Sequence, residues 1–466
     1  MKNILGYYLM PHPPLAVPEV GDNSGIVTTV NACQDIAKEI KLKAPETIVI
    51  ITPHGVMFRD AIAISNDSSI EGDFGRFRAK KVKINKSIDT ALSNEIFLQA
   101  TINKVPAVKV GKRYLKDFNR DYELDHGALV PLYFIDKEYS NYQIVHITYG
   151  LLGKMELYQF GMKIKEAINS LGRKTVIIAS GDLSHRLSRD GAYPYSPQGK
   201  VFDHQLISFL EQGDVISIFS MKPRLIEEAG ECALKSVYIM LGSIDQEFKG
   251  RKLSYEGPYG VGYGVMSFYL SDNKESFFPL LMIKEEELKR KKIEYSNDYV
   301  KLARLSLEHY YKYNEKFPVP KDISKTLTSR KAGVFVTLKS HGNLRGCIGT
   351  FIPNQSSIAL EIVENALSAA LRDPRFPSVK SIELDDIEIS VDVLSPPQPV
   401  TKADLDPAVF GVIVSKGYKR GLLLPDLEGV DTVDKQLTIA CEKAGIDFNE
   451  EYQIERFLVT RYREEE

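Results

Sequence analysis

Four histidines stand in sequence contexts that would bring them to one site. His12 lies in PHPP after the apolar run NILGYYLM, His54 ends the run ETIVIITPHG, and His185 follows TVIIAS in the phrase SGDLSH. His126 lies in ELDHGALVPLYF, ahead of another apolar segment. Neutral imidazole is a common ligand of divalent metals, and its ordinary pKa suits it to proton transfer near neutral pH. These residues are therefore candidates for a metal centre with acid–base chemistry.

A third metal ligand is expected from the segment IEEAGECALKSVYIMLGS, which holds Glu231 and Cys232. A carboxylate would complete the set of two histidines and one carboxylate that leaves open positions on ferrous iron. A thiolate from Cys232 would suit a softer or redox-active metal. Adjacent helical residues point about 100° apart, so only one of the two is expected to reach the metal. Glu231 would otherwise be a solvated carboxylate in the first turn of a helix, favoured by the helix dipole.

The apolar runs that precede His12, His54 and His185 are rich in Val, Ile and Thr, which indicates buried strands. Segments with helical periodicity lie between them, such as NACQDIAKEIKLKA and MELYQFGMKIKEAINSL. This alternation predicts an α/β sheet with helices on both faces. Ligands of such sheets bind at the carboxyl ends of the strands, which is where all three histidines would lie. His146, inside the run QIVHITYG, is expected to be a core residue without a role in the site.

The composition is that of a soluble globular protein with more than one domain. The chain has 466 residues, of which 43% are apolar and 26% charged, and one core rarely organises so many residues. A net charge of −2 gives no overall basic field, so nucleic acid is not an expected partner. No apolar stretch reaches a membrane-spanning length and no secretion signal is recognisable, so no contact with membranes is expected. Four scattered cysteines fit a reducing cytoplasm.

A change of composition at the charged run IKEEELKRKKIE marks the end of the first domain. We assign residues 1–272 to the first domain, 273–293 to a linker and 294–466 to a second domain. In the second domain, the helical segment SSIALEIVENALSAALRD lies among strand-like segments such as AGVFVTLKS and DIEISVDVL. This mixture predicts a smaller α+β fold.

The motifs of the first domain resemble those of the class III extradiol dioxygenases of the LigB type and their Memo-like relatives. The phrases that carry the resemblance are PHPPLAVPEVG, PHG, DHGALVPLYF, SGDLSH and YEGPYGVGYG. The resemblance implies that His12, His54 and Glu231 hold non-haem Fe(II). In the Memo-like relatives a cysteine is the third ligand, and Cys232 stands at that place. The resemblance also implies a catechol-like aromatic substrate.

The same resemblance implies roles around the substrate. His185 corresponds to the acid–base histidine of the family and His126 to a histidine that contacts substrate, and we expect Asp182 of SGDLSH to bind substrate as well. An Fe(II)-dependent oxidoreductase that cleaves a catechol-like ring is the first hypothesis. A hydrolase or lyase that uses Zn(II) or another divalent metal in the same pocket is the second. A metal-binding subunit without catalysis is the third.

The second domain resembles the AMMECR family through LRGCIGT, ENALSAALRDPRFP, ISVDVLSPP and KGYKRGLLLP. No settled activity comes with that family. One interpretation is a cleft for an anionic or nucleotide-like ligand, lined by His341, Arg345, Cys347, Arg372 and Arg375. The alternative is that Arg372, Asp373 and Arg375 form structural ion pairs.

The order of the two domains resembles that of the AmmeMemoRadiSam system. The resemblance implies association with a Memo-like protein and a radical-SAM protein. We also expect the chain to form a homo-oligomer in the cytoplasm.

Overall fold

The chain folds into two compact units, Met1–Glu286 and Glu287–Glu466. The computed structural model describes residues 3–295, 297–320, 323–340, 343–427 and 429–464. Helix α10 (Phe278–Tyr295) contains the division and occupies most of the segment 273–293 that the sequence assigns to a linker. None of the described helices combines the length and the apolar character that crossing a membrane requires.

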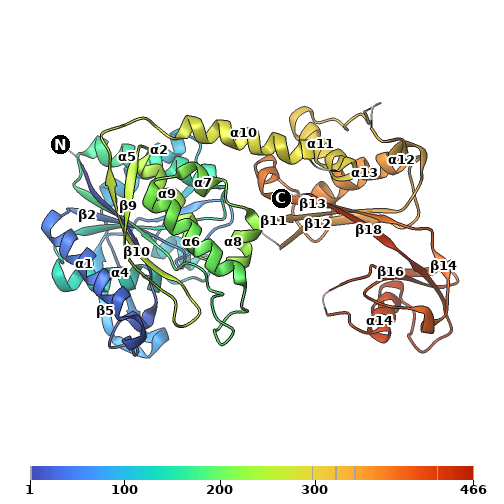
Figure 1. Cartoon of the computed structure of the whole chain (residues 1–466), viewed down its shortest axis with the longest axis horizontal. Helices are drawn as coiled ribbons and strands as arrows, with labels where there is room; N and C mark the ends of the chain where they lie inside the picture. Colours follow the sequence, from blue (N-terminus) through green and yellow to red (C-terminus); the bar gives the residue numbers. More distant parts are fainter. Residues whose placement is uncertain (1–2, 296, 321–322, 341–342, 428, 465–466) are drawn as a thin grey trace. The chain divides into compact units, whose positions relative to one another are not determined.

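An eight-stranded sheet forms the centre of the first unit (Figure 1). Its four middle strands are parallel, and antiparallel strands flank them on both sides. In spatial order the strands are β6 (Ala107–Val110), β3 (Ile62–Ser65), β7 (Gln143–Thr148), β2 (Thr47–Thr52), β8 (Thr175–Ser180), β1 (Ile4–Met10), β10 (Tyr263–Leu270) and β9 (Phe248–Glu256). Strands β2 and β8 are buried at every position, which is typical of parallel strands covered on both faces.

Helices cover both faces of this sheet, so the predicted α/β fold is confirmed. Helices α1 (Val27–Lys43) and α4 (His126–Glu138) pack on one face, where Tyr8 and Met10 of β1 point. A second group of helices packs on the opposite face (Figure 1). These are α2 (Thr90–Ile102), α5 (Lys154–Leu171), α6 (Pro197–Gln212), α7 (Val215–Phe219), α8 (Pro223–Ala229) and α9 (Leu234–Ile244).

A hairpin and a short helix of the first unit lie outside the sheet. A hairpin of β4 (Ser69–Phe74) and β5 (Ala79–Ser87) is joined by the short helix η3 (Gly75–Phe77). Helix α3 (Lys112–Lys116) follows β6. The hairpin matters for the site because its turn brings an aromatic side chain to the start of α4, as described below.

The carboxyl ends of β2, β8 and β1 lie side by side, because these strands are neighbours in the sheet and run parallel. His12 follows the last residue of β1 by two positions, and His54 follows the last residue of β2 by the same interval. His185 lies in the loop after β8. The predicted placement of the three histidines at one edge of the sheet is therefore what the structure shows.

The second unit is a smaller α+β fold, as predicted. Its first sheet consists of β12 (Asn343–Thr350), β11 (Val334–Ser340), β13 (Ile387–Leu394) and β18 (Val459–Arg463). One face of that sheet packs against α11 (Asp298–Tyr313) and α13 (Ile358–Leu371), with α12 (Lys325–Ser329) nearby. The second sheet consists of β14 (Gln398–Pro399), β17 (Gln453–Phe457), β15 (Gly411–Lys416) and β16 (Lys419–Leu423), covered by α14 (Val433–Ala444).

Candidate metal centre

Prolines hold the chain rigid around His12. Pro11, Pro13 and Pro14 have no backbone donor, and each ring fixes φ, so ordinary strand pairing ends at Met10. The one amide hydrogen among residues 11–14 belongs to His12, and it donates to Asp182 Oδ1 at 2.9 Å. The backbone of His12 is thus fixed by the prolines and by the loop that follows β8.

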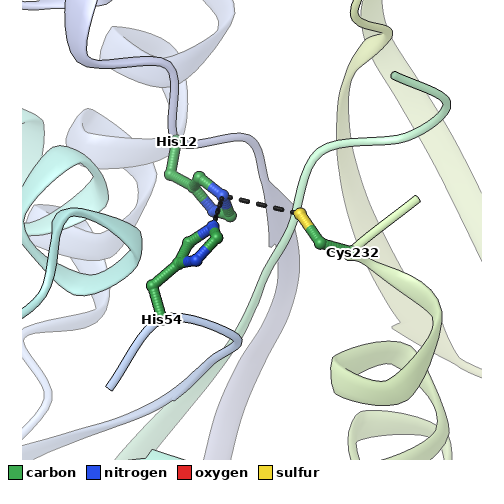
Figure 2. Close-up of side chains that lie close together, drawn as sticks. All are labelled: His12, His54 and Cys232. Carbon is green, nitrogen blue, oxygen red and sulfur yellow. Dashed lines mark hydrogen bonds between the residues drawn. The ribbon is translucent and has the colours of Figure 1, made fainter. Parts of the chain in front are cut away.

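Three donor atoms from separate parts of the chain converge at this edge of the sheet. His12 Nε2 lies 3.1 Å from His54 Nε2 and 3.6 Å from Cys232 Sγ. Figure 2 shows the three side chains pointing toward one another. One donor atom from each of these residues lies within 4.8 Å of the other two. Among the described residues, this is the group of side chains placed to share a metal ion.

Cys232 reaches the site because the segment before α9 packs closely against the loop after β8. Its N–H donates to Asp182 O at 3.1 Å, and the Asp182 N–H donates to Cys232 Sγ at 3.3 Å. A Cβ atom on Gly181 would lie only 2.2 Å from the Cα of Ala233. Only glycine permits this approach, so Gly181 of SGDLSH is needed to bring the thiol to the imidazoles.

A hydrogen-bond chain settles which nitrogen of His12 faces the site. The Ser180 hydroxyl donates to Gly127 O at 2.5 Å, so it accepts from His12 Nδ1 at 2.9 Å. With its hydrogen on Nδ1, the ring presents the Nε2 lone pair to His54 and Cys232. An outer hydrogen bond of this kind fixes the tautomer and the ring orientation of metal-bound histidines.

The electrostatics of the site keep its histidines uncharged. Burial lowers the pKa of His12 well below its usual value, and the neighbouring His54 lowers it further. Burial also lowers the pKa of His54. Burial and the charge of Asp182 raise the pKa of Cys232 well above that of a free thiol. Two neutral imidazoles and a thiol that would give up its proton to a cation fit a divalent metal.

Glu231 takes a different place from Cys232. Its Oε2 accepts a hydrogen bond from Leu234 N–H at 2.6 Å, at the N-terminus of α9. Burial raises the pKa of this carboxyl to about 7. The side chain is therefore engaged with the helix that follows, and the structure places the Cys232 sulfur, rather than the Glu231 carboxylate, beside the two imidazoles.

His126 and His185 lie beside the three donor atoms without joining them. The His126 ring stacks on that of His54 with centroids 4.1 Å apart and meets Phe77, from the turn of the β4–β5 hairpin, at 5.5 Å. Burial and the nearby His12 and His54 lower its pKa to about 3. The His185 ring stacks on Tyr193 with centroids 5.1 Å apart.

Electrostatic contacts connect His185 to the same site. Burial lowers its pKa, while the charge of Asp182 acts in the opposite direction. Asp182 is itself buried, and burial raises its pKa to about 6. The structure shows that Asp182 holds the backbone of His12 and Cys232; contact with substrate remains a prediction for this residue.

Sequence reasoning missed three residues that hold the site together. Asp125 and His146 form a buried pair with His146 Nε2 2.9 Å from Asp125 Oδ2, and Ser180 bonds to His12 as described. His146 is 4% exposed, as expected of a core residue. The sequence offered one signal, because Asp125 directly precedes His126 in ELDHG. No sequence signal connects it to His146.

The residues predicted for a cleft in the second unit are mostly bound in ion pairs. Arg345 holds Glu383 through two hydrogen bonds, of 2.7 and 3.0 Å, and Arg372 pairs with Glu364. Arg375 pairs with Asp373 and donates to Cys347 O at 3.1 Å. His341 lies outside the described residues. The structure thus brings Cys347 and Arg375 together and directs Arg372 toward a helix, α13; a shared ligand remains a prediction.

Comparisons with known proteins divide the chain in the same way as the fold does. The family model described as the catalytic LigB subunit of aromatic ring-opening dioxygenase matches residues 6–266. The AMMECR1 family model matches residues 300–466. Protein CA_C1420 of Clostridium acetobutylicum is 48% identical over 464 residues, which cover 98% of this chain and 99% of that protein. A protein of Thermotoga maritima is 52% identical over 168 residues, 35% of this chain and 97% of its own length.

Two solved structures resemble parts of the chain. The uncharacterized protein PH0010 from Pyrococcus horikoshii has 32% identity and a TM-score of 0.34, and covers 36% of this chain and 90% of its own. The uncharacterized protein JW3007 from Escherichia coli K12 has 12% identity and a TM-score of 0.40, and covers 56% of this chain and 98% of its own. By the match over more than half of its length, the chain belongs to the LigB family of aromatic ring-opening dioxygenases and carries an AMMECR1 domain after its LigB domain.

Proposed function

We propose that the first unit is a metal-dependent oxidoreductase of the extradiol dioxygenase type that acts on a catechol-like aromatic. The observation that carries the proposal is the convergence of His12, His54 and Cys232, with His126 and His185 beside them. The proposed metal is Fe(II), held by the two Nε2 atoms and the thiolate. When bound, it would supply Lewis acidity and redox chemistry with dioxygen.

The proposed role of His185 is to take a proton from a substrate hydroxyl and to return it later. Its lowered pKa keeps the ring neutral near pH 7, so it has a free lone pair for the proton. The imidazolium formed in this step would lie within electrostatic range of Asp182, whose charge favours it. Stacking on Tyr193 holds the ring in place during the transfer.

The proposed role of His126 is to contact the substrate while staying uncharged. A pKa near 3 means that the ring carries no positive charge that would repel a bound cation. Stacking on His54 and contact with Phe77 hold the ring beside the three donor atoms. A neutral imidazole can both donate and accept a hydrogen bond, which suits the orientation of a diol.

One observation favours a second candidate function. The third donor is a thiol rather than a carboxylate, and thiolate with imidazole is a ligand set that Zn(II) also takes. With Zn(II) in this position, the same residues would support a hydrolase or lyase through an activated water. Dioxygen would then play no part in the reaction.

The two candidates are separated by metal reconstitution under anaerobic conditions. Wild-type protein loaded with Fe(II) is expected to open a catechol ring only when dioxygen is admitted, as followed by absorbance of the product. The His185→Gln variant is expected to keep its iron and to lose about 10²- to 10⁴-fold in kcat, because it lacks the acid–base group. His204→Ala, an exposed histidine of α6, is the matched control and is expected to behave as wild type.

If the wild type binds no iron, or if a His12→Ala, His54→Ala double variant binds iron equally well, the proposed ligands are wrong. Activity of a zinc-loaded protein that is unaffected by strict anaerobiosis would favour the hydrolase or lyase.

A further inference from the structure

A buried chain of polar side chains lies directly behind the candidate metal centre. Ser65 ends β3, His146 lies on β7, and Asp125 precedes α4. Ser65 Oγ lies 2.9 Å from His146 Nδ1, and His146 Nε2 lies 2.9 Å from Asp125 Oδ2. Ser65 is 2% exposed and His146 4% exposed.

The residue types are those of a Ser-His-Asp hydrolase, but the burial excludes that role. A nucleophilic serine must reach a substrate carbonyl, and the hydroxyl of Ser65 is closed off from solvent. The three hydrogen-bonded side chains therefore have a structural role, which is to hold other parts of the protein in place.

The carboxylate of Asp125 gathers groups from three elements. Its Oδ1 accepts from Thr52 Oγ1, at the end of β2, at 2.5 Å and from Ala128 N–H, in the first turn of α4, at 3.3 Å. Its Oδ2 accepts from His146 Nε2–H, because an ionised carboxylate has no hydrogen to donate. Burial raises the Asp125 pKa, but the hydrogen bonds from His146 and Thr52 and the nearby imidazoles outweigh burial and hold the pKa below its usual range, so the carboxylate is ionised.

These contacts lead to two of the site's histidines. The Thr52 hydroxyl that bonds to Asp125 also accepts the backbone N–H of His54, at 3.3 Å. Asp125 is the N-cap residue of α4, and His126 is the first residue of that helix. A shift of the carboxylate would therefore move the backbone on which both rings are mounted.

Close packing makes the turn after His54 depend on the same region of β7. A Cβ atom on Gly55 would lie 2.1 Å from Thr148 Oγ1 and 3.3 Å from both Asp125 Oδ2 and His146 Cε1. The turn is consequently packed tightly against β7, so a shift of this strand would also move His54.

We propose that His146 is a positioning residue of the metal centre, which acts through Asp125 to fix the orientation of His54 and His126. The proposal rests on the proposed metal site and adds a residue that has no contact with the metal or the substrate. Ser65 completes the arrangement by holding the second ring nitrogen of His146, so that Nε2 always points to Asp125.

The test uses the full chain with three substitutions. His146→Leu removes both hydrogen bonds at similar volume, and His146→Gln restores a donor toward Asp125. Ile147→Val, the buried neighbour on β7, loosens the same strand without touching Asp125 and serves as the matched control. Zn(II) affinity is measured by competition with a chromophoric chelator.

We expect His146→Leu to weaken Zn(II) binding about 10- to 100-fold, as for other outer-shell partners of metal-bound histidines. His146→Gln is expected to recover most of the affinity, and Ile147→Val to bind as wild type. Unchanged affinity in His146→Leu, or a glutamine variant no better than leucine, would overturn the proposal.

A second readout needs no metal. Long-range ¹⁵N–¹H spectra of histidine side chains are expected to show one set of signals for His54 and His126 in the metal-free wild type and several sets in His146→Leu. One unchanged set in both proteins would overturn the positioning role. If the wild type binds no Zn(II), the proposed metal function fails, and these spectra still decide the role of His146.

Discussion

His12 is held at its backbone and at both ring nitrogens. The amide donates to Asp182, Nδ1 donates to Ser180, and Nε2 faces the other two donor atoms. The prolines of PHPP restrict the backbone on both sides of His12, and these partners hold its amide and its ring. Ser180 ends β8 and Asp182 lies in the loop that follows it, so no local pattern around His12 could indicate these partners.

The sequence alone did not decide which of two adjacent residues is the third metal ligand. Glu231 and Cys232 are adjacent, so their positions along the chain do not distinguish them. Their directions do, because the carboxylate caps α9 while the sulfur points to the imidazoles. The difference depends on where α9 begins, and it begins after both residues, at Leu234.

Removal of the Ser180 hydroxyl tests the tautomer of His12. In Ser180→Ala the Nδ1 hydrogen loses its acceptor inside a buried site, so the ring is free to turn or to place its hydrogen on Nε2. We expect Zn(II) affinity to fall about 10-fold or more, measured by chelator competition. Ser243→Ala, a buried serine of α9 whose hydroxyl bonds to Met240 O, is the control. Equal loss in both variants would show that the effect is not specific to His12.

Among the secondary-structure elements, the strands that precede the histidines were predictable from the sequence. The order in which these strands pair in the sheet was not. Runs of Val, Ile and Thr marked β2 and β8 as buried strands. The pairing of β7 with β2 is a long-range contact, and it is this pairing that brings His146 to Asp125. A histidine inside a strand therefore looked like an ordinary core residue.

Helix α6 carries a buried carboxyl group, Asp203, whose titration should affect the free energy of unfolding. Asp203 accepts hydrogen bonds from Ser184 N–H at 2.7 Å and Tyr255 OH at 2.8 Å, and burial raises its pKa to about 7. Between about pH 4 and 7 the folded protein thus binds more protons at this residue than the unfolded protein does. The contribution of Asp203 to the free energy of unfolding is therefore expected to fall as pH rises through this window.

Asp203→Asn removes that proton while it keeps the shape of the side chain. The change in the free energy of unfolding from pH 5 to pH 8 should be more favourable in Asp203→Asn than in wild type by on the order of 2 kcal/mol, measured by urea unfolding followed by circular dichroism. Asp190→Asn, an exposed aspartate, is the control. The same pH dependence in wild type and Asp203→Asn would contradict the expected titration.

At the scale of the whole molecule, two units with separate cores share one chain. The composition and the motifs predicted both fold classes, because each unit carries its own periodic apolar segments. The arginines of the second unit were harder to interpret from sequence. Their carboxylate partners, such as Glu383 for Arg345 and Glu364 for Arg372, are not next to them in the chain.

We propose that two imidazoles and one thiolate of this chain hold a metal. X-ray absorption at the iron edge of the Fe(II)-loaded full chain, prepared anaerobically, tests it most directly. We predict one sulfur neighbour together with imidazole nitrogens, and loss of the sulfur signal in Cys232→Ser but not in Cys347→Ser, a half-buried cysteine of the second unit. A metal shell of nitrogen and oxygen alone in the wild type, or one unchanged in Cys232→Ser, would show that the Cys232 thiolate is not a ligand.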